Sequence, residues 1–349
     1  MPDVWFAVPG DPATLTGGYV YARRLTEALP SAGWMAHPVR LPAGYPNPSA
    51  ADLKETRDIF AQLPEDAVVL ADGLAFSAMP RDVLEATPHL NMVALVHHPL
   101  ADESGLSAAD AARFRQTERT ALEFARAVVV TSPHTGDTLV RDYGVARDLL
   151  HVAVPGTDRA QRARNISGTP QLLTVATLTY RKGHDVLIKA LAEIKDLPWH
   201  STLVGSLARD PAVVTHIKEL IAVHELQDRV TLAGELQDTA LSAAYGSANV
   251  FVLPSRHEGY GMVFAEALAH GLPIVACAAG AVPETVPPDA GVLVPPDDPA
   301  ALATALRRIL SDVSYRTRLS DAAWTHGQHL PTWRDTAACV ADALWAALP

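Results

Sequence analysis

Two glutamates, Glu258 and Glu266, are separated by seven residues in the segment HEGYGMVFAE, which carries the clearest chemistry in the sequence. The apolar, partly β-branched run 249–254 before them ends in proline and predicts a short buried strand. Residues 262–270 have helical spacing and are followed by a Gly-Leu-Pro stop. A glycine-bearing loop between this strand and this helix would direct free backbone N–H groups and the positive end of a helix dipole at one point. That geometry suits a phosphate or a diphosphate.

The two carboxylates have different expected places around this anion site. Glu258 falls in the loop, whereas Glu266 falls in the second helical turn, roughly 7 Å further along at a rise of 1.5 Å per residue. Taken singly, each is better explained as a solvated carboxylate. A carboxylate beside an anion site repels the ligand, however, unless hydroxyl groups take up its acceptors. The pattern therefore indicates a ligand in which sugar hydroxyls flank a diphosphate.

A second segment, 174–185, places two adjacent cations after a predicted strand. Its sequence is TVATLTYRKGHD, in which Arg181 and Lys182 come just before a helix predicted to begin near His184. Two cations on a loop are usually solvated. Opposite a diphosphate, they would neutralise the charge that builds up on a leaving group.

The run from Pro254 to Glu284 resembles the glutamate–seven residues–glutamate signature of retaining, nucleotide-sugar-dependent glycosyltransferases of the GT-B fold, in the large family-four group. The resemblance covers most of the chain. It implies that Glu266 holds the ribose hydroxyls of the nucleotide and that Glu258 lies beside the transferred sugar. It also implies backbone amides that contact the sugar and the distal phosphate, and these belong to Gly259, Tyr260, Gly261, Met262 and Val263.

The same resemblance assigns further donor contacts and reveals two departures from the family's pattern. The positions that match the surroundings of the nucleoside and the loop behind the sugar are Gly205, Glu235, Leu236 and 280–284. An arginine is common five residues before Lys182, but Thr177 stands there, so we expect Arg181 to supply the missing charge. Ala279 stands where the family often has glycine.

Ligands of open α/β sheets lie at the carboxyl ends of the strands, and three residues of the first half fall at such ends. Gly17 and Gly18 follow the first predicted strand and precede a helix, where their N–H groups could meet a phosphate. Asp72 ends another predicted strand. We expect Gly17 and Gly18 on the donor side and Asp72 on the acceptor side, although ordinary turns explain all three equally well.

Two histidines, His97 and His98, follow the predicted strand 92–96. The resembling enzymes often have a histidine at this strand end, near the sugar hydroxyls or the acceptor; His97 fits this position best and His98 is the alternate. Glu103 is expected to hold one imidazole in place. A metal pair is the other interpretation, but no Cys, His or Asp cluster at ligand spacing supports it, and we expect neither a metal nor another cofactor. The G-x-G-x-x-G fingerprint is absent, which counts against a nicotinamide enzyme.

Apolar strands alternate with helical periodicity along the whole chain. They are predicted at 4–8, 67–71, 92–96, 127–130 and 151–154, and again at 172–175, 201–204, 229–232, 249–253 and 273–276. This pattern is typical of parallel sheets covered by helices on both faces. We therefore expect an α/β protein with two Rossmann-like parallel-sheet domains facing a central cleft, the GT-B fold that the resemblance implies.

The expected domain boundaries follow the composition. An acceptor-side domain is predicted at 1–158, a polar linker at 159–170 and a nucleotide-sugar-binding domain at 171–331. The last segment, 332–349, is predicted as a helix that packs back on the first domain, as the resemblance implies, with Trp333 as its anchor.

Composition excludes several partners. The chain has 349 residues, 48% hydrophobic and 19% charged, which is typical of a soluble globular protein of two domains. Its net charge of −11 argues against nucleic acid and against a general hold on anionic lipid. The best local basic patch consists of Arg113, Arg115, Arg119 and Arg126. Interspersed Asp110, Glu118 and Glu123 favour a solvated face of mixed charge instead.

Localisation is expected to be cytoplasmic, in a bacterium. Cys277 and Cys339 lie far apart in apolar surroundings, which predicts two reduced, buried thiols. No apolar run approaches 18 residues and no basic leader precedes the first strand, so we expect neither a membrane span nor a signal peptide.

Together with these features, the resemblance implies a retaining, metal-independent glycosyltransferase that moves a hexose from a UDP- or GDP-sugar to a hydroxyl of a small or carbohydrate acceptor. Arg181, Lys182 and the loop amides would stabilise the leaving group. A non-catalytic nucleotide-sugar-binding protein is the alternative that Thr177 supports, and another GT-B enzyme, such as a nucleotide-sugar epimerase, is a further one. The sugar, the base and the acceptor stay undetermined at this point, because base contacts in this fold are largely made by the backbone.

Overall fold

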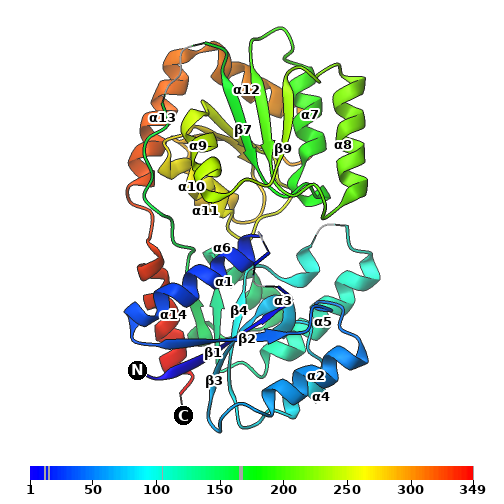
Figure 1. Ribbon diagram of the computed structural model, residues 1–349, viewed down its shortest axis with the longest axis vertical. Coiled ribbons are helices and arrows are strands. Elements are labelled where there is room, and N and C mark those ends of the chain that lie inside the picture. The colour runs from blue at the N-terminus through cyan, green and yellow to red at the C-terminus, as the bar shows by residue number, and fades with distance from the viewer. Residues whose placement is uncertain (12, 15, 104, 165–167, 349) are drawn as a thin grey trace. The chain divides into compact units, whose positions relative to one another are not determined.

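The chain folds into two compact units. The computed structural model describes residues 1–11, 13–14, 16–103, 105–164 and 168–348, so residues 165–167 of the predicted linker lie outside the described residues. The first unit comprises Met1–Gly156 together with the C-terminal segment from Pro331, and the second comprises Thr157–Leu330. Each unit contains its own parallel sheet flanked by helices (Figure 1).

The sheet of the first unit has six parallel strands among the described residues. In spatial order they are β2 (Met35–Leu41), β1 (Asp3–Pro9), β3 (Val68–Asp72), β4 (Asn91–Val96), β5 (Ala127–Val130) and β6 (Leu150–Val152). The helices of this unit are α1 (Gly17–Ala28), α2 (Ala50–Phe60), α3 (Gly73–Phe76), α4 (Arg81–Glu85), α5 (Ala108–Leu122), α6 (Pro133–Thr138) and α14 (Trp333–Ala346). Short helical turns lie at η1 (Leu29–Ala32), η2 (Leu100–Asp102), η3 (Leu139–Tyr143) and η4 (Arg147–Leu149).

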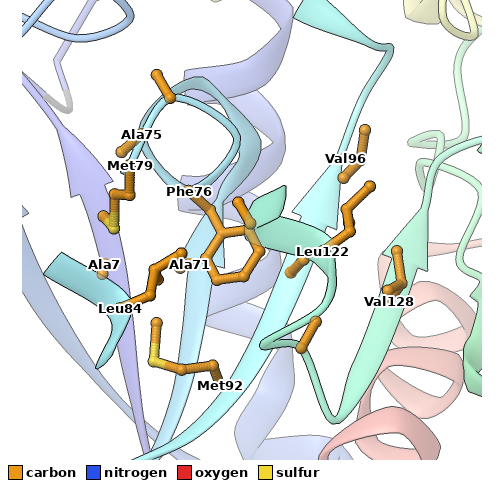
Figure 2. Packing of buried hydrophobic residues seen from close by; sticks show 14 of the residues in the cluster. Ala7, Ala71, Ala75, Phe76, Met79, Leu84, Met92, Val96, Leu122 and Val128 are labelled. Carbon is orange, nitrogen blue, oxygen red and sulfur yellow. The ribbon is translucent and has the colours of Figure 1, made fainter. Parts of the chain in front are cut away.

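The three central strands β3, β4 and β5 are buried at every position, which explains why their sequences are continuously apolar. Alternate side chains enter opposite faces of the sheet. Figure 2 shows Ala71, Phe76, Met92 and Leu122 among the residues that fill the core on one face. A rigid, fully covered sheet of this kind holds the residues at its strand ends in fixed positions.

The second unit repeats this architecture with a different sequence. Its six parallel strands, again among the described residues, are in spatial order β12 (Gly291–Val294), β11 (Ile274–Cys277), β10 (Val250–Leu253), β7 (Gln171–Val175), β8 (His200–Val204) and β9 (Val230–Gly234). Its helices are η5 (Tyr180–Lys182), α7 (His184–Ala192), α8 (Pro211–Val223), α9 (Asp238–Ser247), α10 (Met262–Ala269), α11 (Val282–Thr285), α12 (Pro299–Ser311) and α13 (Val313–Gly327). The predicted α/β class with two parallel sheets is confirmed.

The last helix, α14, belongs to the first unit and packs against α1, β5 and β6. Thr332 and Asp335 form a capping box at its start. Trp333 is buried and meets the ring of Tyr21 edge-on at 5.6 Å between centroids, and a side chain at Gly156 would collide with its backbone. The predicted anchoring role of Trp333 thus has a structural basis.

Three expectations from the sequence need correction. Cys277 is buried as predicted, but Cys339 is exposed, because the inward face of α14 falls on residues such as Val340 and Leu344. Glu118 lies on the buried face of α5 and does not belong to a solvated mixed-charge face; its Oε2 accepts a hydrogen bond from the amide of Leu100 at 3.1 Å. The edge strands β2 and β12 were not predicted. Among the described residues no helix has the length and apolar character needed to cross a membrane.

Candidate active site

The two predicted cations of the second unit lie on a tight turn that follows β7. Arg181 and Lys182 end the 3₁₀ turn η5, and Gly183, at φ +67°, links it to α7. Only glycine fits at this link, because a Cβ there would lie 2.0 Å from the carbonyl oxygen of Pro254. The turn is therefore pressed directly against the segment that follows β10.

Both cations converge on Glu258. Lys182 Nζ lies 2.6 Å from Glu258 Oε1, and Arg181 Nη1 lies 3.4 Å from Glu258 Oε2. Arg181 Nη1 also donates to the carbonyl of His257 at 3.0 Å. The structure thus brings together three of the predicted catalytic residues, two from one loop and one from another.

Glu258 is almost fully buried, with 5% of its surface exposed. Burial alone would raise its pKa, but the charges of Lys182 and then Arg181 outweigh that effect and hold the pKa at about 2. Glu258 is therefore a carboxylate at any physiological pH. A buried ion pair of this kind costs desolvation and is a common feature of functional sites.

The loop from Glu258 into α10 depends on two glycines with left-handed backbone conformations. Gly261 caps α10 at φ +84°, and a Cβ there would lie 2.5 Å from the ring of Phe264. Gly280, at φ +58°, passes so close that a Cβ would lie 2.3 Å from the carbonyl oxygen of Glu258, which also accepts the amide of Ala281 at 2.9 Å. These contacts fix the loop whose amides we predicted to bind the donor: Gly259, Tyr260, Gly261, Met262 and Val263. The first amides of α10 have no acceptor within the helix, as at any helix start.

Glu266, on α10, has a different environment. Tyr245 of α9 donates a hydrogen bond from its hydroxyl to Glu266 Oε2 at 2.8 Å. The phenol is buried and stacked on the ring of His270 at 5.1 Å and on that of Phe251 at 5.9 Å. Burial, assisted by the charges of Asp158 and Asp238 and partly offset by Tyr245, raises the pKa of Glu266 to about 7. The pKa of Glu258 is thus lowered, whereas the pKa of Glu266 is raised.

The residues matched to the surroundings of the nucleoside follow β8 and β9. Gly205, at φ +150°, ends β8, where a Cβ would lie 1.9 Å from the carbonyl of Ala176, and its amide donates to the carbonyl of Gly234. Glu235 is exposed, whereas Leu236 packs against the apolar cluster that contains Tyr245. Leu236 therefore packs on the same cluster as Tyr245, the hydrogen-bond partner of Glu266, whereas the side chain of Glu235 lies at the surface.

In the first unit, three predicted residues from separate strand ends meet. His97 Nε2 lies 3.4 Å from Asp72 Oδ2, and a Cβ at Gly18 would lie 3.6 Å from the same imidazole. Asp72 also caps α3, since its Oδ1 accepts the amide of Leu74 at 2.9 Å. The edge of His97 faces the ring of Tyr21. Asp72 is thus a helix cap that also lies beside His97, and its acceptor-side role stays a prediction.

The remaining first-unit candidates are His98 and Gly17. His98 Nε2 lies 3.5 Å from Glu103, which is the imidazole contact that the sequence predicted for Glu103. Gly17 is exposed, and a Cβ there would meet no atom within 4 Å. Gly17 therefore does not face His97 as Gly18 does. Within the described ranges, no group of three or more His, Cys, Asp or Glu side chains is arranged to hold a metal ion.

Two residues of the second-unit site were not predicted. Tyr245 lies in a helix whose sequence offers no distinctive signal. Arg256 lies inside the signature run, and its guanidinium bonds to Asp185, to Asp297 and to the backbone of Tyr180. The only available signal for Arg256 was its position two residues before Glu258.

Comparison with known proteins gives one family model, described as Glycosyl transferases group 1, which matches residues 157–325. The MMP alpha-(1->4)-mannosyltransferase of Mycolicibacterium hassiacum is 30% identical over 318 residues, covering 85% of this chain and 74% of that protein. The D-inositol 3-phosphate glycosyltransferase of Xylanimonas cellulosilytica is 31% identical over 234 residues, or 62% of this chain. This match spans only 56% of that relative's length.

Solved structures resemble the whole chain. Sucrose-phosphate synthase from Thermosynechococcus elongatus has a TM-score of 0.81 and 26% sequence identity, and the match covers 96% of each chain. HepE of Anabaena, solved in complex with UDP and glucose, has a TM-score of 0.79 at 17% identity over 98% of this chain and 99% of that one, a likeness that shows the fold alone. The predicted GT-B fold is confirmed by these neighbours.

Proposed function

The chain belongs to the group 1 glycosyl transferases, and we propose that it transfers a hexose from a UDP- or GDP-sugar to an acceptor hydroxyl, with retention of configuration and without a metal ion. The observation that carries this proposal is the convergence of Lys182 and Arg181 on the buried Glu258, at the start of the loop that leads into α10. A site that only bound a nucleotide sugar would not need two cations and a buried carboxylate at this point.

The cations act on the leaving group in this proposal. As the glycosidic bond breaks, negative charge grows on the distal phosphate of the donor. Lys182 and Arg181, together with the amides between Gly259 and Val263, would stabilise that charge from fixed positions. The acceptor hydroxyl attacks from the face that the diphosphate leaves, and its approach requires positioning more than covalent help from the protein.

The donor's ribose would bind at Glu266. A carboxylate has about four acceptor sites, and Tyr245 uses one of them, so room remains for a pair of hydroxyl groups. Gly205, Glu235 and Leu236 are assigned to the surroundings of the base, and Leu236 packs towards Tyr245. HepE, which shares this fold, was solved with UDP and glucose, so UDP is the first nucleotide to test.

The first unit would supply the acceptor side. We assign His97 to the hydroxyls of the transferred sugar or the acceptor, with the Asp72 carboxylate 3.4 Å from its Nε2 and His98 as a second contact. The relatives' names, an inositol phosphate glycosyltransferase and a mannosyltransferase, agree with a small or carbohydrate acceptor.

The test is release of nucleoside diphosphate from a panel of UDP-, GDP- and ADP-hexoses, with and without candidate acceptors. The proposal expects acceptor-stimulated release from a UDP- or GDP-sugar, and a product whose anomeric NMR signal has the donor's configuration. Tight donor binding without release or turnover would make the protein a binding protein. Conversion of one nucleotide sugar into another would make it an epimerase. Release only with a metal ion, or an inverted product, would overturn the corresponding part of the proposal.

A further inference from the structure

We infer that Arg256 is a positioning residue, which clamps the turn bearing Arg181 and Lys182 against the loop bearing Glu258. Arg256 lies two residues before Glu258, in the segment between β10 and α10, and only 10% of its side chain is exposed. This inference rests on the proposed function, because it explains how the two proposed catalytic cations are held before a donor arrives.

The Arg256 guanidinium makes four hydrogen bonds and one further ion-pair contact. Nε donates to Asp297 Oδ1 at 2.7 Å. Nη1 donates to the carbonyl of Tyr180 and, at 3.0 Å, to Asp185 Oδ1. Nη2 donates to Asp185 Oδ2 at 2.9 Å and lies 2.7 Å from Asp297 Oδ1. Since all three guanidinium nitrogens are engaged by the protein's own acceptors, a role in holding its loops follows.

The acceptors belong to three different segments. Asp185 lies in the first turn of α7, directly after the cationic turn, and forms the bidentate pair. Asp297 follows β12. Tyr180 opens the cationic turn itself, and its ring lies beneath the guanidinium at 3.9 Å. Arg256 therefore bridges both ends of the turn to the neighbouring edge of the sheet.

The backbone completes the clamp. The amide of Arg256 donates to the carbonyl of Arg181 at 2.8 Å, and Gly183 packs directly on the carbonyl of Pro254. The turn and the loop are thus joined through Tyr180, Arg181 and Gly183 on one side and Pro254 and Arg256 on the other. Two cations held this way face Glu258 without rearrangement, which is the condition under which fixed charges stabilise a transition state best.

The chemistry of the clamp requires arginine. A lysine would keep the positive charge, but its single ammonium cannot reach two carboxylates, a carbonyl and an aromatic face in one plane. The conservative variant R256K should therefore preserve the local charge while releasing the cationic turn. A loss of position of about 1 Å lowers turnover by up to roughly a hundredfold in well-ordered sites.

Arg229 provides a matched control in the same unit. Its guanidinium lies over the ring of Trp199 at 3.7 Å and donates to three backbone carbonyls, those of Lys195, Leu197 and Trp199. These partners surround the amino-terminal ends of β8 and β9, whereas the cations follow the carboxyl end of β7. R229K therefore removes an equivalent arginine clamp that has no connection to the proposed chemistry.

The experiment compares wild type, R256K and R229K by donor kinetics, thermal melting and hydrogen exchange. We expect R256K to lower turnover by roughly tenfold to a hundredfold while the donor's Michaelis constant changes by less than about threefold, because position and not contact is lost. Amide exchange should accelerate in peptides covering residues 178–184 only in R256K. R229K should have a lower melting temperature than wild type but keep turnover within about twofold of it at saturating donor.

The outcomes separate the two claims. Wild type that transfers no sugar from any donor overturns the proposed function, while faster exchange at residues 178–184 in R256K alone would still establish the clamp. Normal turnover and normal exchange in R256K overturn the clamp and leave the proposed function standing. A raised Michaelis constant with unchanged turnover in R256K also overturns it, because it would place Arg256 in direct contact with the donor.

Discussion

Lys182 Nζ lies 2.6 Å from Oε1 of Glu258, and this ion pair joins residues 76 positions apart in the sequence. The pair neutralises, within the protein, a cation that the proposed mechanism directs at the donor's diphosphate. The donor must therefore share Lys182 with Glu258 when it binds. Arg181, which approaches the same carboxylate at 3.4 Å, adds a second positive charge that keeps the site cationic.

The loop that carries Glu258 should be sensitive to a single methyl group. Gly280→Ala would place Cβ 2.3 Å from the carbonyl oxygen of Glu258 and force a left-handed backbone on alanine. We expect destabilisation of about 1–3 kcal/mol and loss of most donor turnover, since the loop must move to relieve the contact. Gly246→Ala is the control, because its Cβ would meet nothing within 4 Å on α9 and alanine favours a helix. Thermal melting and donor assays measure both; equal behaviour of the two variants would contradict this account.

Glu266 should contribute directly to nucleotide affinity. We expect Glu266→Ala to weaken nucleoside diphosphate binding by about 1.5–3 kcal/mol, the range for hydrogen bonds that involve a charged group. Glu219→Ala, which changes an exposed glutamate on α8, should leave the dissociation constant unchanged. Isothermal calorimetry with UDP and GDP decides the matter. An unaltered constant in Glu266→Ala would remove the ribose role.

The sequence predicts strands well where they are buried throughout. Strands β3, β4, β5 and β10 are covered on both faces, so their apolar runs are continuous. The strands it misses are at sheet edges. β2 contains Pro38 and is exposed along much of its length. An edge strand tolerates a proline and exposed residues, whereas a central strand does not. β12 is an edge strand whose two middle residues are only partly buried.

The site is predictable from the sequence only where local geometry determines chemistry. Glu258 and Glu266 belong to one strand–loop–helix segment, so the residues that position them are consecutive in the sequence. The partners of Glu266 and of the cationic turn come from elsewhere: Tyr245 from α9 and Arg256 through bonds to Asp185 and Asp297. Such contacts depend on how helices pack on the sheet, which no single segment encodes.

Burial of Glu118 should make stability depend on pH. Burial raises the pKa of Glu118 to about 7, partly offset by hydrogen bonds that include the amide of Leu100. Between about pH 4.5 and 7 the folded chain holds a proton that the unfolded chain has released, so stability falls as pH rises through this window. Glu118→Gln should therefore reduce the loss of melting temperature between pH 5 and pH 8.

A matched variant isolates this effect. Glu123 is an exposed glutamate at the end of α5 that pairs with Arg81, and Glu123→Gln should leave the pH dependence of melting as in wild type. A difference of a few degrees is expected for Glu118→Gln, because ~1 kcal/mol shifts the melting temperature by about 2–4 °C in a domain of this size. Parallel pH profiles for all three proteins would show that Glu118 does not titrate in this range.

Turnover should not require a divalent metal. In the proposed mechanism Arg181, Lys182 and the loop amides provide the positive potential for the leaving diphosphate, a task that a metal ion performs in other enzymes. We expect donor turnover in excess EDTA to equal that in buffer containing Mg²⁺. Turnover that is lost in EDTA and restored by Mg²⁺ or Mn²⁺ would contradict this expectation.

Because Thr177 stands where the family resemblance implies an arginine, Arg181 and Lys182 should both be needed for turnover. If Arg181 and Lys182 replace the arginine that the family resemblance leads us to expect at Thr177, each should matter more in the transition state than in the ground state, because the phosphate charge is larger there. Arg181→Ala and Lys182→Ala should each lower turnover at saturating donor by on the order of 10²-fold or more, with a much smaller change in the donor's Michaelis constant. Arg209→Ala, at an exposed position after β8, serves as the control and should behave as wild type. Near-normal turnover of Arg181→Ala beside a crippled Lys182→Ala would show that this enzyme works with one cation, the one that lies closer to Glu258.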